Sequence, residues 1–201
     1  MARLVQCVPN FSEGRDKEVV EKIVDEIRKV DEVKLLDYSM DKDHNRSVVT
    51  FVGEPEKVIE TAFNACKVAS ELIDMSKHEG GHPRMGATDV IPLIPISDIT
   101  EEECIEYSKK LAERIGKELN IPVFLYEKSA TRKERENLAD IRRGQYEGMA
   151  EKLKDENWKP DYGPDKLNIK AGVTAVGVRP PLIAYNVNLG KIGRASCRER
   201  V

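Results

Sequence analysis

Apolar residues recur along the chain with two periods, one typical of helices and the other of strands. Helical spacing covers residues 16–30, 55–73 and 100–119, and charged residues occupy the opposite side of each predicted helix. Shorter apolar or β-branched runs predict strands at residues 4–8, 33–38, 47–52, 90–96, 122–126, 171–178 and 182–189. Strands that alternate with helices of crossover length predict an α/β fold, in which a mixed, partly parallel sheet has its helices packed on one face.

Local signals refine this pattern. Thr100 followed by Glu103 is a capping box that starts the third helix, and Pro55 suits the first turn of the second. The prolines within residues 90–96 predict a strand that lies at a sheet edge or contains a bulge. Less regular structure is expected elsewhere: a turn at residues 10–14, one or two exposed helices within 129–154, and a loop at 155–170.

The composition limits the class of protein. Of 201 residues, 40% are hydrophobic and 34% charged, which is typical of a soluble globular chain. The net charge of -3 argues against a nucleic-acid surface. No apolar run approaches the roughly 20 residues of a membrane helix, and the start has no signal-peptide pattern, so we expect a cytoplasmic protein. The four cysteines lack CxxC spacing and are expected to be buried thiols.

The last eleven residues, 191–201, differ from the rest of the chain. KIGRASCRERV is basic, lacks hydrophobic periodicity and reads like the translation of a sequencing adapter. We therefore expect this segment to be foreign, and the natural frame to continue past Gly190.

The segment HEGGHPRMGATD, residues 78–89, allows two chemical interpretations. His78-Glu79-x-x-His82 matches a zinc-protease motif, which needs a helix to bring both imidazoles to one metal. The intervening residues are glycines, each of which costs a helix about 1 kcal/mol, and Pro83 disfavours the helical region for His82. The sequence therefore favours a metal-free, glycine-rich loop that presents His82.

His82 is the candidate catalytic residue of this loop, because imidazole transfers protons at neutral pH and glycines allow a substrate to approach closely. A hydrogen-bonded structural histidine is the alternative. Arg84 could hold a substrate carboxylate through two hydrogen bonds, or form an ordinary surface ion pair.

Two further segments could bind a ligand. Asp37, Asp41, Asp43, His44 and Arg46 cluster between two predicted strands, where they either bind a ligand or form a solvated hairpin turn. Small residues lie at the entrance to a later strand and would let a flat ligand rest on the backbone, although turn formation explains them nearly as well: Gly163, Pro164, Ala171, Gly172 and Thr174. No Walker motif, GxGxxG or GxSxG occurs.

Several long segments together resemble the glutamate formimidoyltransferase (formiminotransferase) family over residues 1–190: LVQCVPNFSEG, HNRSVVTFVG, LIDMSKHEGGHPRMGATDVIPLIPI, DYGP and KAGVTAVGVRPPLIAYNVNL. The resemblance implies transfer of a formimidoyl group from N-formimidoyl-L-glutamate to N5 of tetrahydrofolate, in histidine degradation. It also implies one half of a two-subdomain transferase unit whose sheets face each other across a substrate tunnel, and a homodimer.

The resemblance also implies residue roles. The family's catalytic histidine falls on His82, and its folate-contacting segment falls on residues 163–172, which include Lys170. Asp37 lies near the family's site, but a second aspartate of some members is Ser39 here, so its role would pass to Asp41 or Asp43 or be absent. Arg46 and Arg84 are expected to hold substrate carboxylates.

The expected domain boundaries are 1–178 for the N-terminal subdomain, 179–190 for the start of the C-terminal subdomain, and 191–201 for the tail. Three alternatives stay open at this point. They are metal-dependent hydrolysis, formyl transfer between N-formylglutamate and tetrahydrofolate, and a folate-binding fragment without turnover.

Overall fold

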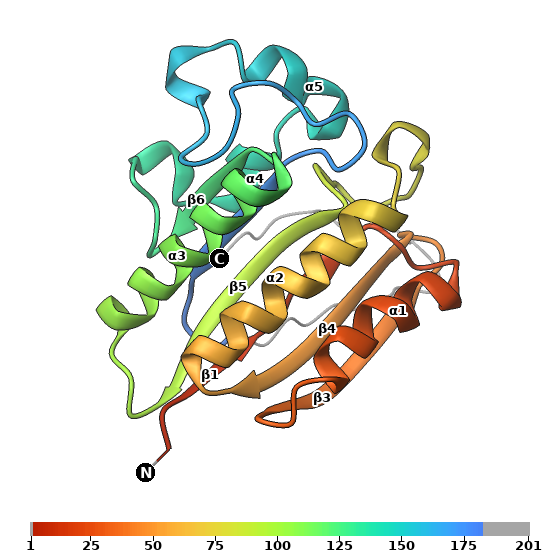
Figure 1. Cartoon of the computed structure of the whole chain (residues 1–201). Coiled ribbons are helices and arrows are strands. Elements are labelled where there is room, and N and C mark those ends of the chain that lie inside the picture. The colour runs from red at the N-terminus through yellow and green to blue at the C-terminus, as the bar shows by residue number, and fades with distance from the viewer. Residues whose placement is uncertain (1, 183–201) are drawn as a thin grey trace, which may run out of the picture.

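One mixed β-sheet organises the chain, and the computed structural model describes it over residues 2–182 (Figure 1). The strands are β1 (Leu4–Cys7), β2 (Asn10–Phe11), β3 (Val33–Asp41), β4 (Arg46–Gly53), β5 (Thr88–Ser97), β6 (Val123–Glu127) and β7 (Thr174–Val178). The helices are α1 (Lys17–Arg28), α2 (Pro55–Leu72), α3 (Glu101–Leu119), α4 (Leu138–Arg142) and α5 (Gln145–Lys152), with 3-10 turns η1 (Met75–Lys77), η2 (Lys133–Arg135) and η3 (Glu156–Trp158).

The sheet combines an antiparallel half and a parallel half, which confirms the predicted mixed sheet. β3 pairs with β4, and β1 and β2 lie end to end between β4 and β5, all antiparallel. β7 runs parallel to β5, and β6 runs parallel to β7. The expected turn at residues 10–14 is shorter than predicted, because Asn10 and Phe11 form β2.

β5 is a central strand, so the prediction of an edge strand for residues 90–96 is wrong. Its neighbours are β1 and β2 on one side and β7 on the other. The alternative, an irregular strand, is confirmed by register shifts opposite Leu4 and between Asn10 and Phe11. Pro92 is tolerated because its carbonyl faces Val8 at the break between β1 and β2, where the ladder does not require its missing N–H.

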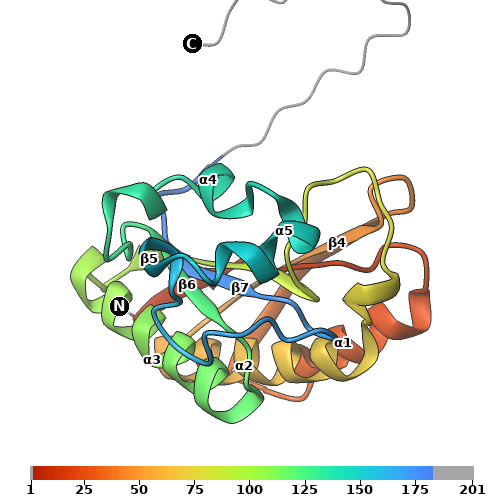
Figure 2. The same ribbon diagram turned by 90° about the horizontal axis from the view of Figure 1, so that it is seen from above.

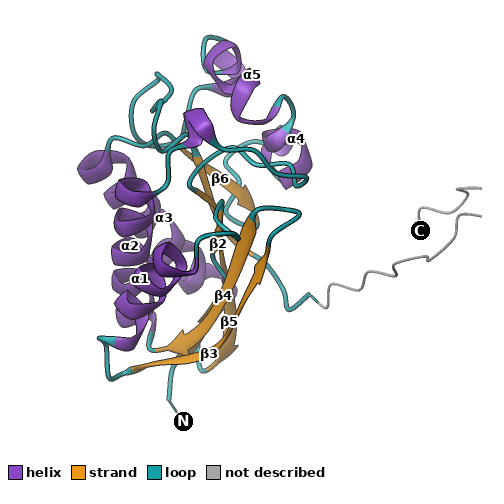
Figure 3. Cartoon of the chain, turned by 90° about the vertical axis from the view of Figure 1, so that its right-hand side faces the viewer, coloured by secondary structure: helices purple, strands orange, loops and turns teal. Residues whose placement is uncertain are grey.

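Helices α1, α2 and α3 cover one face of the sheet (Figure 3). α1 begins at the Asp16 cap, whose carboxylate accepts from two backbone N–H groups. Its apolar side is fully buried, and the predicted capping box of α3 is present. Along β4 the side chains alternate between buried and half-buried positions, so every second residue enters this main core.

Helices α4 and α5 belong to the opposite face, which refines the prediction of helices on one face. With β5, β6 and β7 they enclose a smaller apolar cluster at one end of the sheet (Figure 2). Its buried members are Met85, Val90, Phe124, Tyr126, Ile141, Met149, Leu153, Val173 and Ala175. Two short helices agree with the prediction for residues 129–154.

Three cysteines, Cys7, Cys66 and Cys104, are buried and unpaired as predicted, and burial raises the pKa of each thiol. Within residues 2–182, no helix is long and apolar enough to cross a membrane. The strand expected at 182–189 and the tail at 191–201 lie outside the described residues, apart from Leu182.

Candidate active site

The segment that contains His82 is a loop, as predicted, and not the helix that the zinc-protease motif needs. Both ring nitrogens of His78 have partners in the protein: Nε2 lies 3.1 Å from the Asn45 carbonyl, and Nδ1 accepts from Arg84 at 3.1 Å. A Cβ on Gly80 would lie 2.4 Å from the His44 carbonyl oxygen. The glycine therefore allows the loop to pack directly on the β3–β4 hairpin.

The hairpin turn itself is stabilised by Asp41. Its carboxylate accepts hydrogen bonds from the backbone N–H groups of Asp43 and His44, each at 2.9 Å. This confirms the hairpin alternative for Asp41. Asn45 adopts φ 49° and joins three segments, because its side chain donates to Glu79 O at 2.9 Å and accepts from Gly14 N at 3.0 Å.

A second set of backbone contacts joins the loop that contains His82 (residues 78–87, the histidine loop) to the entrance of β7. Val173 N donates to Met85 O at 2.9 Å, and Ala87 N donates to Ala171 O at 2.8 Å. Between them Gly172 adopts φ 73°, and a Cβ there would lie 2.3 Å from Met85 O. The structure thus brings two predicted residues, Ala171 and Gly172, to the loop of His82.

The other predicted residues take different places. Thr174 is buried and donates to Thr88 O at 2.8 Å. Gly163 packs against α3, and the Lys170 ammonium donates to a carbonyl at the end of α2, so neither joins the loop cluster. The remaining three are exposed or half-exposed: Asp37 on β3, Asp43 in the hairpin turn and Pro164 beside Gly163. Of these, Asp43 contacts the loop through its backbone, because Gly81 N donates to Asp43 O at 3.1 Å.

His82 and Arg46 form the centre of the candidate site. Arg46 Nη1 lies 2.5 Å from His82 Nδ1 and 2.7 Å from Nε2, and Nδ1 also lies 2.5 Å from the Pro83 carbonyl. Because a guanidinium N–H can only donate, Arg46 favours the neutral ring, which keeps a lone pair on one nitrogen. Burial and the neighbouring Arg46 charge lower the pKa of His82, so the ring is neutral at pH 7 as a general base requires.

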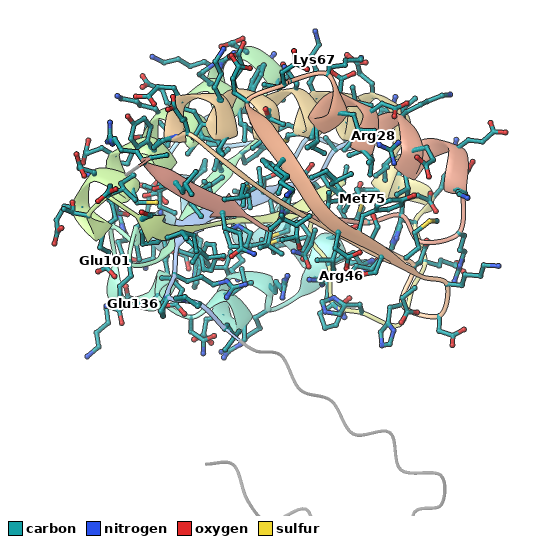
Figure 4. All side chains as sticks on the ribbon, turned by 90° about the horizontal axis from the view of Figure 1, so that it is seen from below. Arg28, Arg46, Lys67, Met75, Glu101 and Glu136 are labelled. Atoms are coloured by element: carbon teal, nitrogen blue, oxygen red, sulfur yellow. The ribbon has the colours of Figure 1, made fainter. Side chains whose placement is uncertain are left out.

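Arg46 is held in place by buried polar groups. Its Nε donates to Asn10 Oδ1 at 3.1 Å, and its Nη1 lies 3.6 Å from the Asp89 carboxylate. Burial lowers the pKa of Arg46 to about 10, and Asp89 opposes that shift, so Arg46 stays charged at neutral pH. Figure 4 shows Arg46 on the side of the sheet away from α2, which carries Lys67.

Three residues of the site were not predicted as site residues from the sequence: Asn10, Asp89 and Arg142. The Asp89 side chain is 2% exposed, accepts from Met85 N at 3.0 Å and pairs with Arg142 of α4. The available signal was a carboxylate at the entrance of an otherwise apolar strand, which needs a cationic partner when buried. Nothing local pointed to Arg142, which lies 53 positions later.

All five N–H groups of Arg84 are directed at protein acceptors. It donates to both Glu147 carboxylate oxygens at 2.9 and 2.6 Å, to Gln145, and to the ring and carbonyl of His78. Arg84 thereby ties the histidine loop to α5. Its expected role in binding a substrate carboxylate stays a prediction.

A cavity of about 490 Å³ adjoins His82 on the side of α4 and α5. It is lined by His82, Pro83, Ala139, Arg142, Arg143, Gly144 and Gln145. A larger cavity of about 590 Å³ lies around Lys152 and Trp158 and does not include His82. The smaller one is the candidate substrate cavity, because only it contains the candidate base.

Comparison with known proteins identifies the family of the chain. The family described as "Formiminotransferase domain, N-terminal subdomain" matches residues 4–179. The chain belongs to this family. It is 59% identical to a glutamate formimidoyltransferase of Streptococcus pyogenes serotype M1 over 189 residues, 94% of this chain and 63% of that protein. It is 52% identical to a glutamate formimidoyltransferase of Thermoplasma acidophilum, over 92% of this chain and 62% of the relative.

A formimidoyltransferase-cyclodeaminase of Dictyostelium discoideum is 51% identical over 94% of this chain, but the match covers 35% of that longer protein. The chain thus spans less than two thirds of the length of each of these relatives.

Proposed function

We propose that the whole protein is a glutamate formimidoyltransferase, which transfers the formimidoyl group of N-formimidoyl-L-glutamate to N5 of tetrahydrofolate. Family membership supports the reaction class. The observation that carries the mechanism is the imidazole of His82, which has a lowered pKa and lines a cavity large enough for a small substrate.

The attacking N5 must lose a proton as it bonds to the formimidoyl carbon, and the glutamate nitrogen must gain one as it leaves. The neutral ring of His82 accepts the first proton and returns it to the departing nitrogen. In this step the substrate amine takes the place of Arg46 Nη1, which lies against both ring nitrogens. When the ring becomes protonated, the Pro83 carbonyl accepts a hydrogen bond from Nδ1.

Tetrahydrofolate is the proposed co-substrate, and no metal takes part in the proposed step. By family resemblance it contacts residues 163–172, whose last members meet the histidine loop through Met85 and Gly86. We also propose that residues 1–178 form the N-terminal subdomain, that 179–190 begin the C-terminal one, and that the protein works as a cytoplasmic homodimer.

The test uses the gene product extended to the length of its relatives. His82→Ala should lower the rate of formimidoyl transfer about 10²- to 10⁴-fold, the range that general base catalysis contributes. Arg114→Gln is the control, because Arg114 lies on α3 and pairs with Glu118 at the surface.

Each variant is assayed with N-formimidoyl-L-glutamate and with N-formyl-L-glutamate as donor. An undiminished rate in His82→Ala would refute the base assignment. Transfer from the formyl donor alone would refute the proposed reaction.

A further inference from the structure

Arg142 differs from the other two arginines beside His82 in having donors to spare. Arg84 uses all five of its N–H groups, and Arg46 contacts Asn10, His82 and Asp89. Within residues 2–182, the side chain of Arg142 has one hydrogen bond, from Nη2 to Asp89, and its buried Nε has no acceptor. Asp89 therefore orients the guanidinium through Nη2, and Nη1 has no protein acceptor among the described residues.

The walls of the cavity next to His82 are rich in arginine, of which Arg143 pairs with Asp140 and Arg142 shares Asp89 with Arg46. Arg142 and Arg143 both line the cavity, and its lining includes no aspartate or glutamate. Asp89, which holds Arg142, also faces Arg46 at 3.6 Å, so a single carboxylate serves two guanidinium groups. Arg142 is close enough to lower the pKa of both His82 and Arg46. An anionic group in the cavity would balance this charge.

We propose that this cavity binds the glutamyl moiety of the formimidoyl donor and that Arg142 pairs with its carboxylate. The inference rests on the proposed function and names the residue that holds the donor. A cavity of about 490 Å³ accommodates a small dicarboxylate with its reacting nitrogen at His82. None of residues 163–172 lines the cavity, so the folate segment does not compete for it.

Arg142 is already oriented before the donor binds. Asp89 holds its guanidinium through an ion pair, so the Arg142 side chain loses little rotamer entropy when the donor binds. Arg142 is 15% exposed, and a charge-assisted hydrogen bond is stronger in such a site than at the open surface.

The test measures binding of N-formimidoyl-L-glutamate to the 201-residue chain by calorimetry. Arg142→Gln should weaken binding by about tenfold or more, the scale of a lost charge-assisted hydrogen bond. Arg142→Lys keeps the charge beside Asp89 and should recover part of the affinity. Arg114→Gln is the control, since Arg114 lies on α3 and pairs with Glu118 at the surface.

A second measurement compares ligands on the wild-type protein. It needs no variant, so it still tests the proposal if Arg142→Gln fails to fold. Wild-type protein should bind the γ-amide analogue N-formimidoyl-L-glutamine, the α-amide analogue, or both, at least about tenfold more weakly than the donor. Equal affinity for the donor and both amides would overturn the proposal, as would unchanged donor binding by a folded Arg142→Gln variant. Weakened binding of tetrahydrofolate instead of the donor would also overturn it.

Turnover by the extended protein separates this proposal from the proposed function. Transfer that proceeds with the donor KM unchanged in Arg142→Gln refutes the Arg142 site and leaves the reaction in place. Donor binding that depends on Arg142, without any transfer to tetrahydrofolate, supports the site and refutes the reaction.

Discussion

The buried carboxylate of Asp89 offers the sharpest test of how the site is assembled. Asp89→Asn keeps the shape of the side chain but removes its charge. Asp89 is 2% exposed and lies between Arg142 and Arg46, while its Oδ1 accepts from Met85 N. The substitution leaves two largely buried guanidinium groups without a counter-charge. Removing one partner of a buried ion pair typically costs about 3–5 kcal/mol, and we expect a loss of stability in this range.

Urea unfolding of the 201-residue chain measures the effect. Asp140→Asn is the matched control, because Asp140 pairs with Arg143, which is 81% exposed, and such pairs contribute about 1 kcal/mol or less. The same variant has an electrostatic signature at His82. Asp89 raises the pKa of His82 against the larger effects of burial and Arg46. Asp89→Asn should therefore lower that pKa further, which NMR titration of the ring detects.

The two readouts together can refute the reasoning. A cost below about 1 kcal/mol would mean that Arg46 and Arg142 do not depend on Asp89 for compensation. A large cost with an unchanged His82 pKa would mean that Asp89 supports the fold without acting on the candidate base.

Three further predictions concern the loop, the base and the scaffold. Gly172→Ala should destabilise the chain by about 1–2 kcal/mol or more, because φ at this position is 73° and the new Cβ would meet Met85 O. Gly148→Ala in α5 is the control: its Cβ would meet nothing within 4 Å, so this variant should be neutral or stabilising. Urea unfolding compares the stability of the two variants. Burial lowers the pKa of His82 below its usual 6.5, and a general base must be unprotonated. The transfer rate of the extended protein should therefore fall only as the pH drops below 6.5. A pH–rate profile whose acid limb lies above 6.5 would contradict this prediction. Thr100→Ala removes the α3 capping box and should cost about 1 kcal/mol in the same unfolding assay, so an unchanged midpoint would show that the cap is dispensable.

Sequence periodicity predicted the scaffold because each long helix carries its own signals. The apolar spacing of α1, α2 and α3 and the Thr100 cap are local properties, and the structure confirms them. The position of β5 was not predictable in this way. Pro92 reads locally as an edge residue, but it is accommodated by a break in the neighbouring strand more than 80 positions earlier, at Val8. Periodicity contains no information about which strand a residue faces.

The site shows the same division between local and long-range information. The chemistry of His82 could be inferred from its loop, and Arg46 from its place between two strands. Their contact, in which Arg46 Nη1 lies 2.5 Å from His82 Nδ1 and 2.7 Å from Nε2, depends on the hairpin and the loop folding against each other. Asp89 and Arg142 were missed for the same reason, since an ion pair between β5 and α4 leaves no spacing pattern in the chain.

The glycines of the loop explain how such a segment can hold a catalytic group still. The sequence suggests that they admit a substrate, yet most of them face the protein's own backbone. A Cβ on Gly80 would lie 2.4 Å from His44 O, and one on Gly86 would lie 2.0 Å from Val173 O. Only at Gly81 is the nearest atom as far as 3.4 Å away. Gly80 and Gly86 therefore fix the loop on either side of His82, and close packing of the backbone, more than flexibility, positions the imidazole.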